Sequence, residues 1–149
     1  MKYFAYGMNT NRVEMSIRCP NARSLGAATL PYYEFRFARH ADVVEHRTST
    51  VDGVLWEITD SCLKSLDVLE GCPYYYDRKF VMVEHNGQEV AAMVYYMLGN
   101  SADSPPSESY LRMLYEGYKV HGLSVKQIHD AIDFSINYDY NTVNEHETI

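Results

Sequence analysis

The chain lacks the features with which proteins bind nucleic acid or a membrane. None of its apolar runs approaches the roughly 20 residues that a helix needs to span a bilayer. It has 13 Lys and Arg against 20 Asp and Glu, a net charge of −7, and no basic cluster. Without clustered positive charge, nucleic acid and anionic membrane surfaces are not expected partners. The chain also contains no repeat and no internal linker.

Cysteine is scarce, and Cys19, Cys62 and Cys72 follow no metal-ligand spacing. The six histidines show no paired spacing either, so we expect surface or capping roles for them and neither a metal nor another cofactor. The segment from Met1 to Tyr6 runs directly into a predicted strand and lacks the apolar core of a signal peptide. We therefore expect reduced cysteines and a cytoplasmic location.

Apolar residues make up 46% of the 149 residues, which is sufficient for one domain with a single sizeable core. We assign this domain to residues 1–136 and a polar C-terminal tail to residues 137–149. Tyrosine is abundant, with 14 residues. Because Tyr favours strands and joins an apolar ring to a polar hydroxyl, this number predicts a strand-rich fold with a pocket that can form hydrogen bonds.

Residue periodicity predicts strands and helices mixed along the chain. The predicted strands cover residues 2–6, 25–39, 51–58, 78–84 and 89–98, the last two joined by a hairpin turn at 85–87. The predicted helices begin near residues 11, 60, 107 and 124. Asn9 or Thr10 is expected to cap the first helix and Asp60 the second. Pro31 predicts a break or bulge, and the polar residues 41–50 predict a surface loop or hairpin tip. Strands adjacent in sequence are mostly antiparallel neighbours, which indicates an α+β fold.

Glu70 lies at the end of the helix predicted from residue 60, which Gly71 ends. The helix dipole is negative at this end and favours cations, yet the last turn carries Asp67 and Glu70. Glu70 also follows Leu66 by four residues, which turns it toward the apolar side of the helix. Partial burial and the dipole both disfavour the ionised carboxylate, so we expect its pKa to be raised. Such a carboxylate suits general acid/base catalysis near neutral pH.

The turn after the first strand, Tyr6-Gly7-Met8-Asn9, leads into the first predicted helix. This arrangement offers several backbone N–H groups that suit a carboxylate or an oxyanion. Gly7 allows a ligand to approach the backbone closely. Most turns of this kind only cap a helix, so the turn alone does not identify a binding site.

Together these features resemble a known family. The segment Tyr3-Phe4-Ala5-Tyr6-Gly7-Met8-Asn9 is similar to the Y-F-A-Y-G-S-N signature of γ-glutamylcyclotransferase-like proteins, which include the AIG2-like and γ-glutamylamine cyclotransferase branches. The resemblance reaches about Ile132 and continues through residues 18–22, 51–56, 66–71, 105–110 and 117–123. The order and spacing of these segments carry it. It implies a small mixed or antiparallel β-barrel-like sheet with flanking helices.

The resemblance also implies a chemistry, the cleavage of a small-molecule γ-glutamyl amide without a metal or cofactor. The α-amine of the substrate attacks its own γ-carbonyl, which yields 5-oxoproline and a free amine or amino acid. The acid/base glutamate of the family falls on Glu70, and a substrate-contacting tyrosine falls on Tyr110. The substrate-binding segment of the family falls on Tyr3, Phe4, Ala5, Tyr6, Gly7 and Met8, with Asn9 adjoining. A homodimer is compatible with this assignment.

Met8 departs from the family signature, which has serine at this position. If the turn acts through backbone N–H groups, Met8 still serves; if the hydroxyl contributes, binding or activity is reduced or the substrate differs. A non-catalytic relative that binds a γ-glutamyl ligand, an amino acid or a protein partner is one alternative. A cysteine-dependent amidohydrolase with Cys72 as nucleophile is another. Tyr110 fits core packing as well as ligand contact, and residues 74–76 fit either a strand start or a wall on the leaving-group side.

Overall fold

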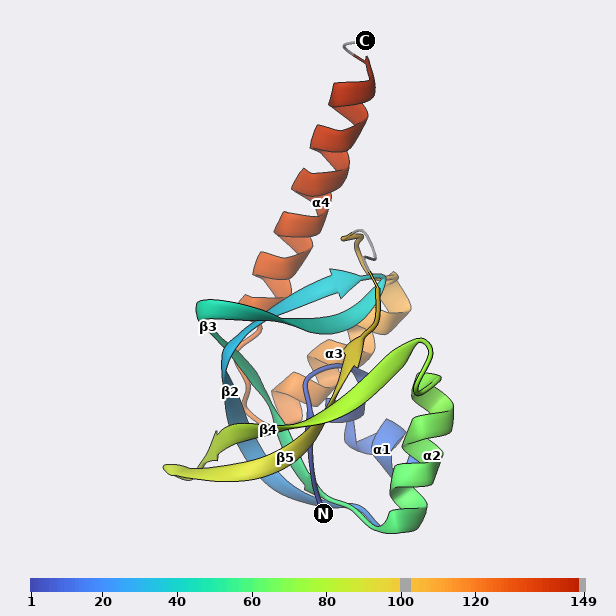
Figure 1. Ribbon diagram of the computed structural model, residues 1–149, viewed down its shortest axis with the longest axis vertical. Helices are drawn as coiled ribbons and strands as arrows, with labels where there is room; N and C mark the ends of the chain where they lie inside the picture. Colours follow the sequence, from blue (N-terminus) through green and yellow to red (C-terminus); the bar gives the residue numbers. More distant parts are fainter. Residues whose placement is uncertain (100–102, 148–149) are drawn as a thin grey trace.

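The computed structural model describes the backbone of residues 1–99 and 103–147, with strands and helices mixed along the chain (Figure 1). The strands are β1 (Lys2–Ala5), β2 (Arg23–Ala38), β3 (His40–Glu57), β4 (Tyr76–His85) and β5 (Gln88–Met97). The helices are α1 (Arg12–Arg18), α2 (Asp60–Glu70), α3 (Glu108–Val120) and α4 (Lys126–Glu147), and η1 (Met8–Thr10) is a 3₁₀ turn. The predicted α+β class is confirmed.

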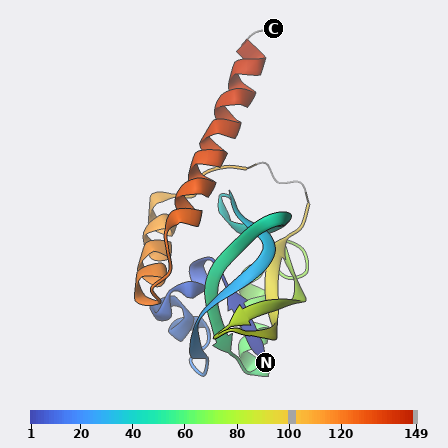
Figure 2. The same ribbon diagram turned by 90° about the vertical axis from the view of Figure 1, so that its left-hand side faces the viewer.

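The strands form a closed barrel in the order β1-β3-β2-β4-β5. The pairs β1–β3, β2–β3, β2–β4 and β4–β5 are antiparallel. Strand β1 closes the barrel by pairing in parallel with β5, where Tyr3 lies opposite Met93. The predicted mixed, barrel-like sheet is therefore confirmed. Helix α4 extends away from the barrel in both ribbon views (Figures 1 and 2).

Strand β1 separates two groups of buried side chains, because successive residues of a strand point to opposite faces. Phe4 and Tyr6 belong to the group that joins the barrel strands to α3 and α4. Tyr3 and Ala5 belong to the group that joins the sheet to α1 and α2. The turn that follows β1 thus emerges where both groups of helices meet the barrel.

The polar stretch at residues 41–50, predicted as a loop or hairpin tip, is part of β3 instead. Its residues stay extended because the backbone pairs with β2, and the hairpin turns earlier, at Arg39. The predicted irregularity at Pro31 is confirmed, since the register shifts between Pro31 and Tyr33. Polar side chains indicate exposure here, but the partner strand decides the backbone conformation.

Two predicted helix caps are displaced by one or two residues. The side chain of Asn11, rather than Asn9 or Thr10, accepts the N–H groups of Val13 and Glu14 at the start of α1. At the start of α2, Thr59 rather than Asp60 accepts the Cys62 N–H. Neighbouring Asx and Thr residues are all competent caps, so composition alone does not choose among them.

The C-terminal stretch predicted as a polar tail, 137–149, is helical as far as residue 147, because α4 continues through it. Residues 100–106, for which the sequence predicts a loop, lie partly outside the described residues. No helix in the part of the chain that the structure describes is long and apolar enough to cross a membrane. A homodimer and a cytoplasmic location stay predictions.

Cys19 and Cys62 form a disulfide, with their Cα atoms 5.0 Å apart. Cys19 caps the end of α1, and Cys62 lies in the first turn of α2, 43 residues later. Both side chains are buried, and the pairing ties the two helices together. The expectation of reduced cysteines is therefore wrong for this pair, because the packing of α1 on α2 leaves no trace in the spacing of the sequence.

We predict that the denatured, unreduced protein exposes one thiol, that of Cys72, and that reduction exposes three. A cross-link across 43 residues restricts the unfolded chain, so Cys62→Ser should lower the free energy of unfolding by about 2–4 kcal/mol. Thiol labelling with mass spectrometry and urea titration measure the two quantities. Cys72→Ser is the matched control and should change the stability by less than about 1 kcal/mol. Three thiols labelled before reduction would contradict the pairing.

Candidate active site

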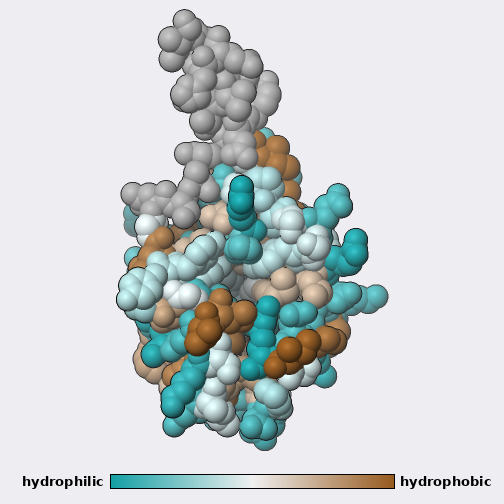
Figure 3. Space-filling model, turned by 90° about the vertical axis from the view of Figure 1, so that its right-hand side faces the viewer, coloured by the Kyte–Doolittle hydropathy of each residue, from teal (hydrophilic) through white to brown (hydrophobic). Residues whose placement is uncertain are grey.

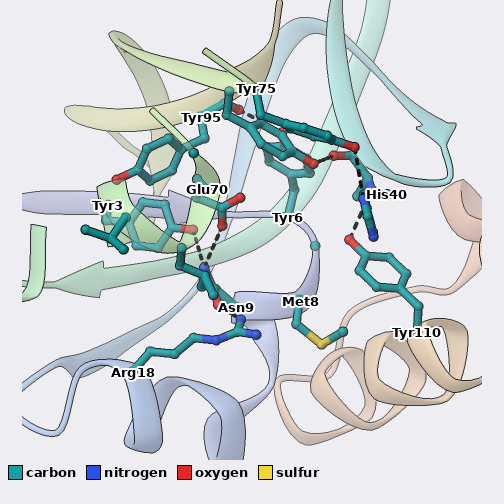
Figure 4. A pocket seen from close by; sticks show the side chains of 16 residues that line it. Tyr3, Tyr6, Met8, Asn9, Arg18, His40, Glu70, Tyr75, Tyr95 and Tyr110 are labelled. Atoms are coloured by element: carbon teal, nitrogen blue, oxygen red, sulfur yellow. Dashed lines mark hydrogen bonds between the residues drawn. The ribbon is translucent and has the colours of Figure 1, made fainter. Parts of the chain in front are cut away.

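A pocket of about 400 Å³ lies where η1, the ends of α1 and α2, the start of β3, and α3 converge (Figure 4). Its lining is dominated by tyrosine, as the composition predicts. The lining residues are Tyr3, Tyr6, Gly7, Met8, Asn9, Arg18, His40, Ala41, Val68, Leu69, Glu70, Gly71, Tyr75, Tyr76, Tyr95 and Tyr110.

Glu70 is the last residue of α2, and its carboxylate lies beside Asn9 in the pocket (Figure 4). Gly71 ends the helix in the left-handed conformation, with φ of 63°. Leu66, one turn earlier, is fully buried and holds this side of α2 against the sheet. The predicted spacing of Leu66 and Glu70 thus places the carboxylate on the inner side of the helix.

Burial raises the pKa of the Glu70 carboxyl from 4.5 to about 7, while the Arg18 charge and the Asn9 hydrogen bond lower it. The predicted direction of this shift is confirmed. Desolvation disfavours the ionised form, and the two polar neighbours offset only part of that effect. Near neutral pH the carboxyl group populates both protonation states, so it can accept a proton and return it.

Asp67, the second acidic residue of this helix end, has partners of its own. Arg78 Nε donates to both carboxylate oxygens, at 3.0 and 3.3 Å. The Tyr95 hydroxyl donates to Oδ1 at 2.7 Å. Arg78 of β4 and Tyr95 of β5 therefore stabilise the negative charge of Asp67 at the C-terminus of α2. The pKa of Glu70, in contrast, stays raised.

The side chain of Asn9 joins three pocket residues. Its Nδ2 donates to the Tyr3 hydroxyl at 3.0 Å and to Glu70 Oε1 at 3.4 Å. Its Oδ1 accepts a hydrogen bond from Arg18 Nη1. Arg18 also forms an ion pair with Glu14, one turn earlier in α1, at 3.4 Å. This wall of the pocket is polar and carries both charge signs.

The hydroxyls of several wall tyrosines are bound to the protein itself. Tyr6 donates to the carbonyl of Tyr95 at 2.7 Å, and Tyr76 donates to the carbonyl of Ala41 at 2.6 Å. Tyr95 donates to Asp67 of α2, which does not line the pocket. Each of these bonds joins two elements of the fold, so the rings are held in fixed positions.

Tyrosine is neutral at pH 7 at its ordinary pKa of about 10, and burial here strengthens that preference. It raises the pKa of Tyr110 to about 12 and the pKa values of Tyr3, Tyr76 and Tyr95 well above their usual range. All four therefore stay neutral near pH 7 and do not act as bases there.

The turn after β1 lies against Tyr110, whose hydroxyl accepts the Ala41 N–H at 3.0 Å. A Cβ atom on Gly7 would lie 3.0 Å from the Cβ of Ala41 and 3.2 Å from the Tyr110 hydroxyl. Glycine thus lets the turn pass between β3 and α3, and both Met8 and Tyr110 line the pocket.

The opposite wall is aromatic and more exposed. His40 Nδ1 lies 3.0 Å from the Tyr75 hydroxyl, and the His40 ring centre lies 5.2 Å from that of Tyr110. At the rim, Val68 is 84% and Leu69 is 47% exposed. Figure 3 faces the side on which α2 lies and shows apolar side chains as separate groups among hydrophilic ones. The pocket therefore has one enclosed polar side and one open aromatic side.

The structure brings together Glu70, Tyr110 and most of the segment predicted to bind substrate, which are Tyr3, Tyr6, Gly7, Met8 and Asn9. Phe4 and Ala5 do not line the pocket, although both were predicted as binding residues. Their side chains are buried in the two cores, because the backbone of β1 is paired on both sides and only its side chains reach other groups. The motif contains strand residues as well as site residues.

Nine lining residues were not predicted as site residues, and five of them have polar side chains: Arg18, His40, Tyr75, Tyr76 and Tyr95. The sequence places Arg18 only within a matching segment and predicts a surface or capping role for His40. For Tyr75 and Tyr76 it predicts either a strand start or a pocket wall, and both line the pocket. Arg18 had one usable signal: it lies two helical turns after Asn11, on the same face of α1, and its long side chain reaches back to Asn9. His40 and Tyr95 arrive from distant strands and had no such signal.

Cys72, the alternative nucleophile, does not line the pocket. Its thiol lies 3.7 Å from Asp77 Oδ1. Burial and the charges of Asp67 and Asp77 raise the pKa of the thiol. The thiolate, which is the reactive form, is therefore disfavoured. Among the described side chains no group of three His, Cys, Asp or Glu could hold a metal ion.

Comparison with known sequences yields one consistent family. The profile described as "Gamma-glutamyl cyclotransferase, AIG2-like" matches residues 3–113. The γ-glutamylcyclotransferase of Homo sapiens is 28% identical over 141 residues, which is 83% of this chain and 73% of the human protein. That of Bos taurus is 28% identical over 138 residues, with the same two shares.

Comparison with solved structures agrees. A structure named "Gamma-glutamyl cyclotransferase" superposes with a TM-score of 0.77 at 25% identity, covering 93% of this chain and 86% of that chain. YkqA from Bacillus subtilis has the same TM-score and identity, covering 89% of this chain and 54% of that chain. The barrel and its helices are therefore shared with these proteins.

The raised pKa of Glu70 predicts a pH-dependent stability. Its folded value of about 7 exceeds its unfolded value of 4.5, so ionising Glu70 opposes folding. This cost is absent below pH 4.5, grows between these two values, and is complete above pH 7. Glu70→Gln should therefore raise the free energy of unfolding by about 1–3 kcal/mol near pH 8 and leave it nearly unchanged near pH 4.

Urea titration at these two pH values measures the effect. Gln keeps an oxygen that accepts the Asn9 hydrogen bond, so the substitution mainly removes the charge. The exposed Glu89 provides the control: Glu89→Gln should shift stability by less than about 0.5 kcal/mol at either pH. A Glu70→Gln variant that is less stable than the wild type near pH 8 would contradict the prediction.

Proposed function

The chain belongs to the γ-glutamyl cyclotransferase, AIG2-like family, and we propose that it cleaves a γ-glutamyl amide by cyclising the glutamyl group to 5-oxoproline. The substrate's α-amine attacks its γ-carbonyl, and the amide bond to the leaving amine breaks. The observation that carries the proposal is a pocket carboxylate, Glu70, with a pKa of about 7. No water and no covalent bond to the protein enters this reaction.

Glu70 is the general acid and base of the proposed reaction. The α-amine arrives as an ammonium group and must lose a proton before its nitrogen can attack. Ionised Glu70 takes that proton and, once protonated, gives it to the leaving nitrogen. The second proton, which the attacking nitrogen loses as it becomes the lactam nitrogen, passes to Glu70 and from there to the released amine. A pKa near the working pH suits both directions of transfer. The neutral tyrosines around it do not compete as bases.

The fixed walls support the cyclisation itself. Attack within one molecule becomes fast when its amine and carbonyl are held in a folded conformer. The rings of Tyr6, Tyr76 and Tyr95 are bonded to the protein and form a rigid boundary for the glutamyl chain. The Tyr110 hydroxyl, whose oxygen accepts the Ala41 N–H, and the backbone N–H of Met8 are the proposed donors to the α-carboxylate or to the developing oxyanion.

Met8 favours one other function, a non-catalytic relative that binds a γ-glutamyl or amino-acid ligand. The family signature has serine there, and the sulfur-bearing side chain of Met8 takes its place near Tyr110 (Figure 4). The Cys72 amidohydrolase has less support, because its thiol lies outside the pocket lining and beside two carboxylates.

Incubation with γ-glutamyl-alanine, γ-glutamyl-ε-lysine and glutathione tests the proposed reaction. We expect 5-oxoproline from at least one of them, detected by mass spectrometry. Glu70→Gln should lower kcat by about 10²–10⁴-fold, the usual contribution of an acid/base group, while the folded state persists. The control Glu89→Gln should retain turnover.

Other outcomes identify the alternatives. Free glutamate as product, lost in Cys72→Ser and kept in Glu70→Gln, would assign the reaction to the thiol. Binding of a γ-glutamyl compound without turnover would establish the non-catalytic relative. Loss of turnover in His40→Asn but not in Glu70→Gln would move the base to His40.

Met8→Ser tests whether the turn acts through its backbone. Since serine and methionine carry the same backbone N–H and differ only in the side chain, we expect kcat/KM to change by less than about fivefold, which is about 1 kcal/mol. An increase above about 100-fold would show that the family hydroxyl takes part in the reaction and that Met8 suppresses it.

A further inference from the structure

The orientation of the Asn9 side chain decides which polar group Glu70 meets. A carboxamide has an oxygen and an NH₂ group of nearly equal size, and turning it over exchanges an acceptor with two donors. In this protein the Asn9 side chain is buried, 3% exposed, with Nδ2 directed to Glu70 and Tyr3. Turned over, it would present Oδ1 to the carboxylate and repel it.

Arg18 fixes that orientation. A guanidinium group has only donors, so it can bond only to the oxygen of the amide. Arg18 Nη1 donates to Asn9 Oδ1, and this leaves Nδ2 for Tyr3 and Glu70 (Figure 4). The Tyr3 hydroxyl does not make the choice, because a hydroxyl can donate or accept.

Arg18 is itself held in place from several sides. It is the last residue of α1, and Glu14 pairs with its second terminal nitrogen at 3.4 Å. Met15, in the same helix, is buried in the core beneath α1 and α2. The next residue, Cys19, is bonded to Cys62 of the helix that carries Glu70. The guanidinium group therefore keeps its position relative to the carboxylate.

We propose that Arg18 is a positioning residue for the acid/base group: through Asn9 it directs an amide donor to Glu70 and keeps the carboxylate available as a base. This inference rests on the proposed cyclisation for its catalytic meaning. Its structural content, the coupling of Arg18 to the protonation of Glu70, can be measured without turnover.

The charges around Glu70 agree with this role. Tyr3 and Tyr6 of the β1 segment, Tyr76 of β4, Tyr95 of β5 and Tyr110 of α3 all face it and are raised in pKa, so they are neutral near pH 7. Asp67 lies on its own helix and is paired with Arg78, and His40 lies across the pocket beside Tyr75. Burial raises the pKa of Glu70, and the groups that lower it are Arg18 and then Asn9.

Arg18 lowers the pKa of Glu70, so its removal should let burial raise that pKa further. In Arg18→Gln we expect the pKa of Glu70 to rise by about one unit, because the positive charge and the fixed amide donor are lost together. The acid limb of the kcat/KM profile should move upward by the same amount. Turnover near pH 7 should fall about fivefold and recover toward the wild-type value near pH 9. A purely structural role would lower turnover equally at both pH values.

Matched variants separate positioning from helix stability. Arg18→Lys keeps a cation that can only donate, so its shift should be less than half that of Arg18→Gln. Arg12→Gln removes an arginine of the same helix whose Nε lies by His121 and which does not line the pocket. It should move the acid limb by no more than about 0.3 pH unit. Arg18→Met keeps the apolar stem and serves as a second uncharged variant if Arg18→Gln does not fold.

The decisive measurement is the titration of the Glu70 carboxyl carbon by ¹³C NMR, assigned through its loss in Glu70→Gln. A higher pKa in Arg18→Gln or Arg18→Met, with the smaller shift in Arg18→Lys, supports the proposal even if no γ-glutamyl compound is turned over. An unchanged titration in the uncharged variants overturns it, even if the wild type makes 5-oxoproline. An equal shift in Arg12→Gln also overturns it, because the effect then does not depend on the contact between Arg18 and Asn9.

Discussion

The pairing of β1 on both of its edges is the constraint on which the pocket depends. This short strand bonds to β3 on one side and closes the barrel against β5 on the other. Its alternating side chains divide the interior, with Phe4 and Tyr6 in one core and Tyr3 and Ala5 in the other. Because the backbone is fixed on both edges, the turn at residues 7–9 leaves the barrel in one direction only, toward the ends of α1 and α2.

At Glu70 the requirement of the proposed reaction opposes the stability of the fold. The fold buries the carboxylate and pays for its ionisation, since burial is the largest influence on its pKa. Arg18 and Asn9 offset part of the cost of ionising Glu70, but not all of it. A fully compensated carboxylate would have an ordinary pKa and would be a poor acid near neutral pH. In the proposed reaction, this incomplete compensation lets Glu70 transfer the proton in both directions.

Sequence patterns predicted the features that neighbouring residues decide, and they missed those that depend on distant partners. Gly71 ends α2 in the left-handed conformation, and the raised pKa of Glu70 follows from its place in that helix. Residues 41–50, in contrast, look like a loop by composition, and only pairing with β2 makes them a strand. Cys19 meets its partner because α1 packs on α2, and His40 reaches the pocket because the β2–β3 hairpin returns beside α3. None of these contacts has a periodicity that a single sequence could display.

Methionine in place of the family serine at position 8 changes the side chain, but the backbone of the turn is still held by its neighbours. Trp56 Nε1 donates to the carbonyl of Asn9 at 3.0 Å, and Thr10 Oγ1 donates to the carbonyl of Gly7 at 2.8 Å. On the other side, Gly117 of α3 lies so close that a Cβ there would be 2.4 Å from Thr10 Oγ1. The turn is therefore clamped by residues before and after position 8. The backbone at position 8 is therefore held in the same place for any residue other than proline, and Met8 changes the side chain that a ligand meets.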